Sequence, residues 1–307
     1  MSIATNSSGA ASVESKSTES SKDTPANIVV RSSNSLYFEV HGSENVSLPP
    51  IVFLHGMQSH RKTYEAWVPF FTKQYRVVLF DLKGHGSSLR GNLDFRLPTL
   101  ATDLKLLLTE LHIQKAHIFG HSFGGRVAIQ FAAQYPSMVQ SLIVEDMDFL
   151  PRRNSGRAED MILIAEKLAS LPRYVDTRQV FEDALAPLIG SDSSTTEAAI
   201  VQTAKGFSIT PQTWADCVTS LFHFWATETN LMPALREVEC PMLFVKAGKQ
   251  SAFPNRAVEI LRVKFPHIQL EVIPDGTHSL HRVKAQELLD IVLPFLERAS
   301  SVVLQQS

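Results

Sequence analysis

The sequence predicts an α/β fold built on a mostly parallel, doubly wound sheet. Short apolar runs without polar alternation recur along the chain, as expected of parallel strands that are covered on both faces. Segments with helical apolar spacing separate these runs, so strand and helix alternate. Near the start, a Ser-Ser-Asn-Ser connection joins two β-rich runs, which indicates that an antiparallel hairpin opens the sheet.

Length and composition limit the architecture and the partners. The 307 residues are 44% hydrophobic and 20% charged, which suits a globular protein of two domains, or of one large domain with an insertion. Lys and Arg number 29 against 31 Asp and Glu, so we expect no nucleic acid partner. Cys217 and Cys240 do not form a disulfide framework, and we expect both to be reduced.

The first part of the chain predicts its order and location. Residues 1–26 are rich in Ser and Thr and poor in large apolar residues, so we expect a disordered tail. No apolar run reaches the roughly 18 residues of a membrane span, and no secretory signal is recognisable. Residues 1–30 contain acidic residues and no Arg, unlike a mitochondrial transit peptide. We expect a cytoplasmic location, with a mitochondrial one left open.

The expected strands and helices follow one another along the chain. The hairpin uses residues 28–30 and 36–40, and six parallel strands follow at 51–54, 77–80, 117–119, 142–144, 242–245 and 270–273. Helices are expected at 64–71, 97–111, 125–134, 254–265 and 284–299. In the helix at 97–111, leucines at helical spacing form one buried face.

One interval interrupts the alternation between the sixth and seventh strands. From about 149 to 238 we expect no strand, only helical patterns such as that of Met161, Ile164 and Leu168. We therefore expect a helical cap at 149–238, inserted into an α/β core formed by 27–148 and 239–307. The cap aromatics can pack its helices or line an apolar pocket. They are Phe207, Trp214, Phe222, Phe224 and Trp225.

A Gly-x-Ser-x-Gly motif carries the first sign of chemistry. Gly120-His121-Ser122-Phe123-Gly124 lies between an expected strand and an expected helix, and a serine on so sharp a turn presents its hydroxyl at the carboxyl edge of the sheet. The hydroxyl is a poor nucleophile, so an imidazole must accept its proton. His278 follows the last expected strand and is the candidate base, and His281 is its nearest rival.

With the Gly-x-Ser-x-Gly motif and three further motifs, this sequence resembles the α/β-hydrolase family over roughly residues 28–298. Residues 54–57 are similar to the His-Gly loop of that family, 81–88 to its Asp-x-x-Gly-x-Gly-x-Ser loop, and 274–278 to the turn with the catalytic histidine. The resemblance implies the α/β-hydrolase fold with a cap. It also implies an oxyanion hole in which Met57 supplies one backbone N–H, while Phe123, just after the nucleophile, supplies the other.

The carboxylate that orients the histidine is missing from its common place. Many family members carry it after the seventh strand, where residues 245–251 contain no Asp or Glu. Some members, including bacterial and mitochondrial esterases, carry it after the sixth strand, where this chain offers Glu145, Asp146 and Asp148. We choose Asp146 as the acid, with Asp148 in reserve. The alternative that none of the three is catalytic stays open.

These residues predict a serine hydrolase that cleaves carboxylic esters or thioesters through an acyl-Ser122 intermediate, with a small apolar acyl or aryl ester as substrate. We expect no cofactor, and no zinc, because His278 and His281 lack a third ligand at a recognisable spacing. The same triad would serve a carbon–carbon bond hydrolase, an acyltransferase or a perhydrolase. A non-catalytic small-molecule-binding homologue is the remaining alternative, favoured only by the missing carboxylate. The sequence does not indicate the oligomeric state.

Overall fold

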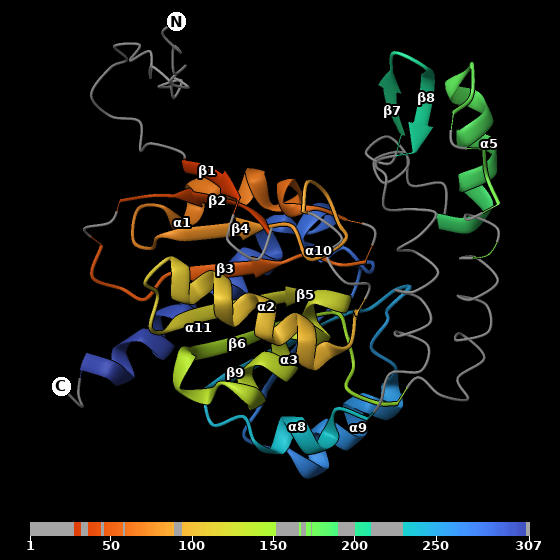
Figure 1. The fold of residues 1–307 in the computed structure, drawn as a ribbon. Coiled ribbons are helices and arrows are strands. Elements are labelled where there is room, and N and C mark those ends of the chain that lie inside the picture. Colours follow the sequence, from red (N-terminus) through yellow and green to blue (C-terminus); the bar gives the residue numbers. More distant parts are fainter. Residues whose placement is uncertain are drawn as a thin grey trace, which may run out of the picture.

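A computed structural model describes most of the α/β core and parts of the expected cap. The described residues are 28–31, 36–43, 46–57, 59–88, 94–151, 166, 170–172, 174–189, 200–209 and 230–304. The expected tail at 1–26 lies outside them. Figure 1 shows the described core as one central sheet with helices on both faces.

The central sheet has eight strands in the order β1-β2-β4-β3-β5-β6-β9-β10. β1 and β2 form the expected antiparallel hairpin, β2 pairs antiparallel with β4, and every later neighbour is parallel. The strands are β1 (Ile28–Arg31), β2 (Tyr37–His41), β3 (Ile51–Leu54), β4 (Val77–Phe80), β5 (Ala116–His121), β6 (Val139–Glu145), β9 (Met242–Ala247) and β10 (Gln269–Ile273). The prediction of a mostly parallel, doubly wound sheet is confirmed.

Burial on both faces explains the unbroken apolar runs. Every residue of β3, β4, β5, β6 and β9 is buried, so neither face of these strands selects polar residues. β5 lies between β3 and β6, and β6 lies between β5 and β9. The carboxyl ends of β5 and β6 are therefore neighbours at one edge of the sheet.

Two hydrophobic cores lie on opposite faces of the sheet. One face packs against α2 (Leu97–Glu110), α3 (Phe123–Gln134), α8 (Met232–Arg236) and α9 (Asn255–Lys264). The other packs against the 3₁₀ helix η1 (Arg61–Trp67), α1 (Val68–Phe71), α10 (Leu280–Val283) and α11 (Ala285–Leu304). The expected helices occur, although α3 begins two residues early and the expected helix at 64–71 divides into η1 and α1.

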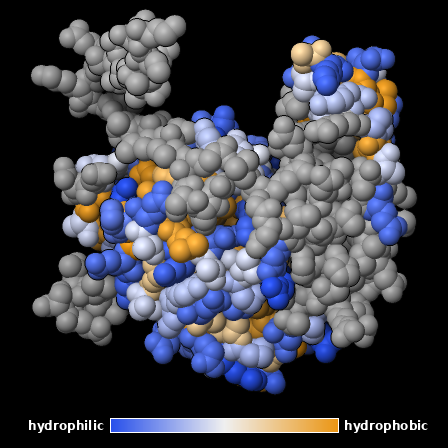
Figure 2. All heavy atoms as spheres, in the orientation of Figure 1, coloured by the Kyte–Doolittle hydropathy of each residue, from blue (hydrophilic) through white to orange (hydrophobic). Residues whose placement is uncertain are grey.

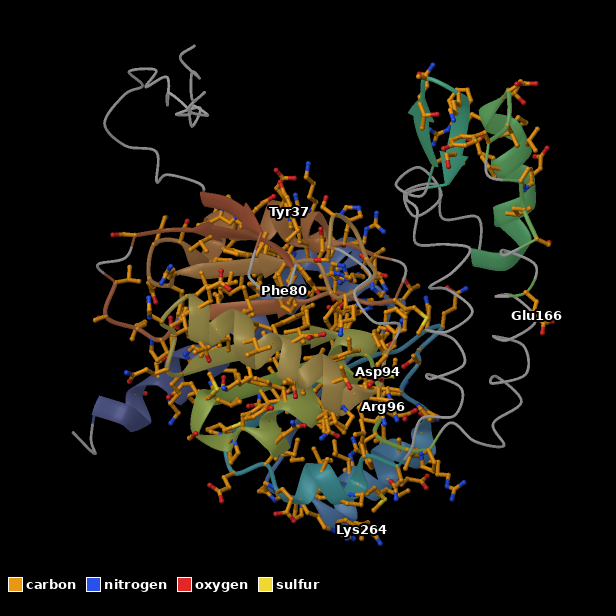
Figure 3. All side chains as sticks on the ribbon, in the orientation of Figure 1. Tyr37, Phe80, Asp94, Arg96, Glu166 and Lys264 are labelled. Carbon is orange, nitrogen blue, oxygen red and sulfur yellow. The ribbon has the colours of Figure 1, made fainter. Side chains whose placement is uncertain are left out.

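Polar side chains lie at a helix end and over the surface of the α/β core. Asp94 accepts hydrogen bonds from the Arg96 guanidinium and from the Thr99 hydroxyl in the first turn of α2 (Figure 3). The Arg96 hydrogen bonds hold the pKa of Asp94 below its usual range. On the face drawn in Figure 2, hydrophilic residues spread across the described surface with smaller hydrophobic patches between them.

The insertion between β6 and β9 contains strands that we did not expect. Besides α5 (Arg178–Ile189), it contains the hairpin of β7 (Ile200–Thr203) and β8 (Gly206–Ile209), so the expectation of no strand between 149 and 238 is wrong. Each strand has four residues, too few to show clear alternation, and Gly206 supports the turn with a φ of 103°. Of the five aromatics named for the expected cap, Phe207 lies in β8, whereas Trp214, Phe222, Phe224 and Trp225 lie outside the described residues.

The insertion enters and leaves the core at adjacent points. The Leu231 backbone N–H donates to the carbonyl of Phe149 at 2.9 Å, which joins the two ends. The fully buried Arg126 guanidinium donates to the carbonyls of Asp148 and Leu150 and so holds the start of the insertion. Figure 1 shows α5, β7 and β8 on the side to which the parallel strands point. The inserted segment therefore begins beside the carboxyl edge of the sheet.

Two further sequence expectations concern membranes and thiols. Among the described helices, none combines the length and hydrophobicity needed to cross a membrane. Cys240 is a free thiol, and burial raises its pKa to about 12. Cys217 lies outside the described residues.

The buried His117 gives a testable dependence of stability on pH. Its imidazole is fully buried between the hydroxyls of Ser141 and Ser300, and burial, followed by the charge of Lys115, lowers its pKa to about 4. The unfolded chain, with a histidine pKa near 6.5, binds this proton first, so His117 costs stability as pH falls from 6.5 towards 4.

We expect His117→Gln to reduce the loss of unfolding free energy between pH 7 and pH 5 by about 2 kcal/mol, measured by urea denaturation at both pH values. His267→Gln, a change at an exposed histidine, is the control and should leave the pH dependence unchanged. An unchanged pH dependence in His117→Gln would contradict the assignment of a neutral, buried imidazole.

Candidate active site

The candidate nucleophile lies on a tight turn between β5 and α3. Ser122 has φ 51° and ψ −120°, a backbone conformation that non-glycine residues rarely adopt. Its backbone N–H donates to the carbonyl of Glu145 at 3.0 Å, which ties the turn to the end of β6. A Cβ on Gly120 would lie 2.5 Å from the carbonyl oxygen of Gly124, so this crossing requires glycine. The turn thus holds Ser122 at the carboxyl edge of the sheet.

The structure brings the imidazole of His278 between Ser122 and Asp146. Its Nε2 lies 2.9 Å from the Ser122 Oγ, and its Nδ1 lies 2.7 Å from the Asp146 Oδ2. An ionised carboxylate only accepts hydrogen bonds, so Nδ1 carries the proton and Nε2 of a neutral imidazole accepts from the serine hydroxyl. This tautomer is the one that can remove the hydroxyl proton.

Asp146 is fully buried and receives four hydrogen bonds. Besides His278, its donors are the backbone N–H groups of Ala247 and Ala252 and the Ser251 hydroxyl, which lies 2.5 Å from Oδ1. Burial alone would raise the pKa of Asp146, but the hydrogen bonds, led by those from His278 and Ser251, hold it below its usual value. The carboxylate therefore stays charged beside the imidazole.

The residues after β9 contact Asp146 in a way that the sequence did not predict. Residues 245–251 lack a carboxylate, yet the Ala247 N–H at the end of β9 and, after β9, the Ser251 hydroxyl and the Ala252 N–H all donate to the Asp146 carboxylate. A hydroxyl or an N–H group at the end of β9 is the sequence signal for such a contact, because β9 pairs with β6. Asp146 itself leaves β6 with a φ of 44°, a conformation that Asp tolerates better than most residues.

The other candidate acids and the rival histidine lie elsewhere. Asp148 is buried, accepts from the backbone N–H of Leu150 at 2.8 Å and lies 3.7 Å from Arg126. Glu145 points towards α10, where its carboxylate accepts hydrogen bonds from the backbone N–H and from Nδ1 of His281. The carboxylate that contacts His278 is therefore that of Asp146.

The His-Gly loop after β3 packs against the nucleophile turn. A Cβ on Gly56 would lie 3.3 Å from the Cβ of Ser122, so glycine permits this close approach. His55 Nδ1 donates to the carbonyl of Gly56, while the N–H of Leu82 donates to His55 Nε2. These bonds join the loop to the segment after β4. Met57 follows Gly56 in the same turn, and Phe123 begins α3, whose first N–H groups have no partner within the helix.

The Asp-x-x-Gly-x-Gly-x-Ser segment after β4 supports the core. The Asp81 carboxylate accepts from the backbone and the guanidinium of Arg61 and from the backbone N–H of Ser87. Gly86 has a φ of 49°, and a side chain there would overlap the Asp81 carboxylate. The segment is therefore a turn built around a buried carboxylate.

One group among the described residues could offer three metal ligands. The ligand atoms of His121, Glu145 and His281 lie within 4.8 Å of one another, although the residues are far apart in the sequence. His281 Nδ1 already donates to the Glu145 carboxylate, and His121 Nε2 donates to the carbonyl of His278. Hydrogen bonding therefore explains most of this cluster, which does not include the imidazole of His278.

Comparison with known proteins shows the family to which this chain belongs. A family model described as alpha/beta hydrolase fold matches residues 49–285. The sn-1-specific diacylglycerol lipase ABHD11 of Mus musculus is 28% identical over 266 residues, which cover 82% of each chain. The 2-(acetamidomethylene)succinate hydrolase of Mesorhizobium japonicum is 24% identical over 278 residues, which cover 83% of this chain and 90% of that one.

Solved structures share the same architecture. The crystal structure of E-2-(acetamidomethylene)succinate hydrolase superposes with a TM-score of 0.72 at 21% identity, covering 89% of this chain and all of that chain. A marine microorganism esterase gives a TM-score of 0.71 at 23% identity, covering 86% of this chain and all of that one. At these identities the likeness concerns the fold.

The close packing at the nucleophile turn predicts a folding defect in Gly124→Ala. The new Cβ would lie 2.5 Å from the carbonyl oxygen of His55 and even closer to that of Leu54, both in backbone that cannot move freely. We expect the free energy of unfolding to fall by about 2 kcal/mol or more, measured by denaturant titration. Ser122→Ala, which adds no atom to the same turn, should keep nearly wild-type stability. Equal stability of the two variants would refute the proposed crowding.

Proposed function

Since the chain belongs to the α/β-hydrolase family, we propose that it is a serine hydrolase that cleaves carboxylic esters or thioesters through an acyl-Ser122 intermediate. One observation carries this proposal: the hydrogen-bonded chain from the Ser122 hydroxyl through His278 to the buried Asp146 carboxylate, with distances of 2.9 and 2.7 Å. Nucleophile, base and orienting acid are within the range that nucleophilic catalysis needs.

In the proposed acylation step, the Ser122 Oγ attacks the substrate carbonyl carbon while its proton passes to His278 Nε2. The resulting imidazolium is stabilised by Asp146 through the Nδ1–H bond. The backbone N–H groups of Met57 and Phe123 are the proposed donors to the oxyanion of the tetrahedral intermediate. His278 then gives its proton to the leaving alkoxide or thiolate, and the acyl group stays on Ser122.

Deacylation repeats the sequence with water as the nucleophile. His278 removes a proton from water, the hydroxide attacks the acyl carbon, and the proton returns to the Ser122 Oγ as the acid leaves. Each proton moves among Ser122, His278, the substrate and water. The mechanism therefore uses residues of the chain and water, in keeping with the expectation that no cofactor is required.

Two kinds of observation support hydrolysis over simple binding. The relatives named above are a lipase and a hydrolase, and one structural neighbour is an esterase. The lack of a carboxylate after β9, which favoured a non-catalytic binding protein, is offset by the Asp146 carboxylate at the imidazole. The expected substrate is a small apolar acyl or aryl ester.

Ser122→Ala tests the nucleophile. We expect the wild-type protein to react covalently with a fluorophosphonate probe and to hydrolyse p-nitrophenyl esters, because the Ser122 Oγ is the activated oxygen. The alanine variant should show neither reaction while it keeps its fold, measured by circular dichroism. A panel of esters with increasing acyl length would then define the substrate class. Labelling of Ser122→Ala to the wild-type extent would eliminate Ser122 as the nucleophile.

Asp146→Asn tests the acid. The amide keeps the size of the side chain but cannot stabilise the imidazolium and favours the wrong tautomer, so we expect kcat for p-nitrophenyl acetate to fall by up to about 10⁴-fold. Asp148→Asn is the matched control, because Asp148 contacts Leu150 and Arg126 but not His278. Its kcat should stay within about tenfold of wild type. A larger loss in Asp148→Asn than in Asp146→Asn would reverse the assignment.

A further inference from the structure

The turn that carries His278 is held by hydrogen bonds along its length. The Lys249 backbone N–H donates to the carbonyl of Gly276, and His121 Nε2 donates to the carbonyl of His278 at 2.9 Å. Three residues further on, Glu145 accepts two hydrogen bonds from His281, and the Trp67 indole donates to the carbonyl of His281. The backbone on both sides of the catalytic imidazole is therefore anchored to the sheet and to η1.

His121 can hold this backbone because its imidazole stays in one protonation state, the neutral one. Its side chain is buried, and burial lowers its pKa to about 3, so the imidazole is neutral at working pH. A neutral imidazole has one N–H, and the carbonyl of His278 requires it on Nε2. Nδ1 then faces Gly56, where the structure gives it no hydrogen-bond partner. A buried nitrogen without a partner is costly, which indicates that the Nε2 contact is the reason for a histidine here.

Glu145 holds the other side of the turn. Its carboxylate is completely buried, and both oxygens lie about 3 Å from His281 Nδ1, at 2.9 and 3.0 Å, while one also accepts the His281 backbone N–H. Burial would raise the pKa of Glu145, but the neighbouring His281, through its charge and its hydrogen bonds, lowers this pKa below the usual value. His281 Nε2 lies 2.9 Å from the Thr63 hydroxyl, which extends the network to η1.

The holding residues and the reacting residues are neighbours in the sequence. β5 ends in His121 and is followed by Ser122, while β6 ends in Glu145 and is followed by Asp146. The turn offers the His278 imidazole to Ser122 and Asp146, the His278 carbonyl to His121, and His281 to Glu145. Any movement of the turn away from Ser122 and Asp146 would therefore break the bonds to His121 and Glu145 as well.

We propose that His121 and Glu145 are positioning residues, which hold the turn at 276–281 so that the His278 imidazole stays in line between Ser122 and Asp146. The proposal rests on the proposed function, because it assigns a role in the same reaction. His121 donates to the His278 carbonyl and packs its ring against the His278 imidazole, with ring centroids 4.8 Å apart, whereas Glu145 contacts the turn at His281. Neither residue exchanges a proton in the proposed reaction, so the effect of losing them falls on the placement of the imidazole and on the rate of the chemical step.

Two substitutions at His121 separate positioning from packing. The amide nitrogen of Gln can reach the position of Nε2 and donate to the carbonyl of His278, whereas the shorter Asn cannot. We expect His121→Asn to lower kcat and the rate of fluorophosphonate labelling by about 10- to 100-fold with little change in KM, because small displacements of a catalytic group have effects of this size. His121→Gln should recover most of the lost rate.

Glu145→Gln tests the second anchor. The amide has one accepting oxygen in place of two, and we expect kcat to fall about tenfold with KM unchanged. His117→Gln serves as the control, since His117 is another buried histidine of β5 that contacts Ser141 and Ser300 and not the turn. Its kcat should equal that of the wild type. Circular dichroism on every variant excludes loss of fold as the cause of lost activity.

The outcomes distinguish this proposal from the proposed function. Equal kcat in the folded Asn and Gln variants of His121, or wild-type kcat in Glu145→Gln, would overturn the positioning role while labelling at Ser122 stands. Wild-type protein that fails to label, or labelling that persists in Ser122→Ala, would instead overturn the proposed function. Should His121→Asn fail to fold, the decision passes to Glu145→Gln and to the KM and kcat of His121→Gln.

Discussion

The buried carboxylate of Asp146 joins three segments that are far apart in the sequence. Its donors come from the end of β9, from the residues after β9 and from the turn after β10, while Asp146 itself directly follows β6. A carboxylate buried without such donors would cost several kcal/mol or become neutral. The arrangement of loops at this edge of the sheet therefore depends on one charge with all its hydrogen bonds made.

The fold could be predicted because its strands are covered on both faces, which leaves unbroken apolar runs in the sequence. The turn at Ser122 could be predicted for a similar reason, since the crossing of β5 and α3 leaves no space for a Cβ at Gly120 or Gly124. The hairpin of β7 and β8 could not. Its short strands pair mainly with each other, so their sequence carries little of the pattern that a shared core imposes.

The site was only partly accessible to sequence reasoning. The motifs indicate Ser122 and His278, and the adjacency of β5 and β6 brings Asp146 within reach. Which of two neighbouring acids turns towards the imidazole depends on backbone geometry, because Asp146, with a φ of 44°, contacts His278 while Glu145 contacts His281. The contacts of Ser251 and His121 depend on side chains that meet across more than 100 residues, and no local pattern encodes them.

The hydrogen bond between Phe149 and Leu231 has a consequence for the evolution of the family. It closes the inserted segment at its base, so the core experiences the segment mainly as a loop whose ends are already together. The entropy of closing a loop grows only with the logarithm of its length, and doubling the length costs about 0.6 kcal/mol. Evolution can therefore lengthen, shorten or exchange the segment at small cost to the core.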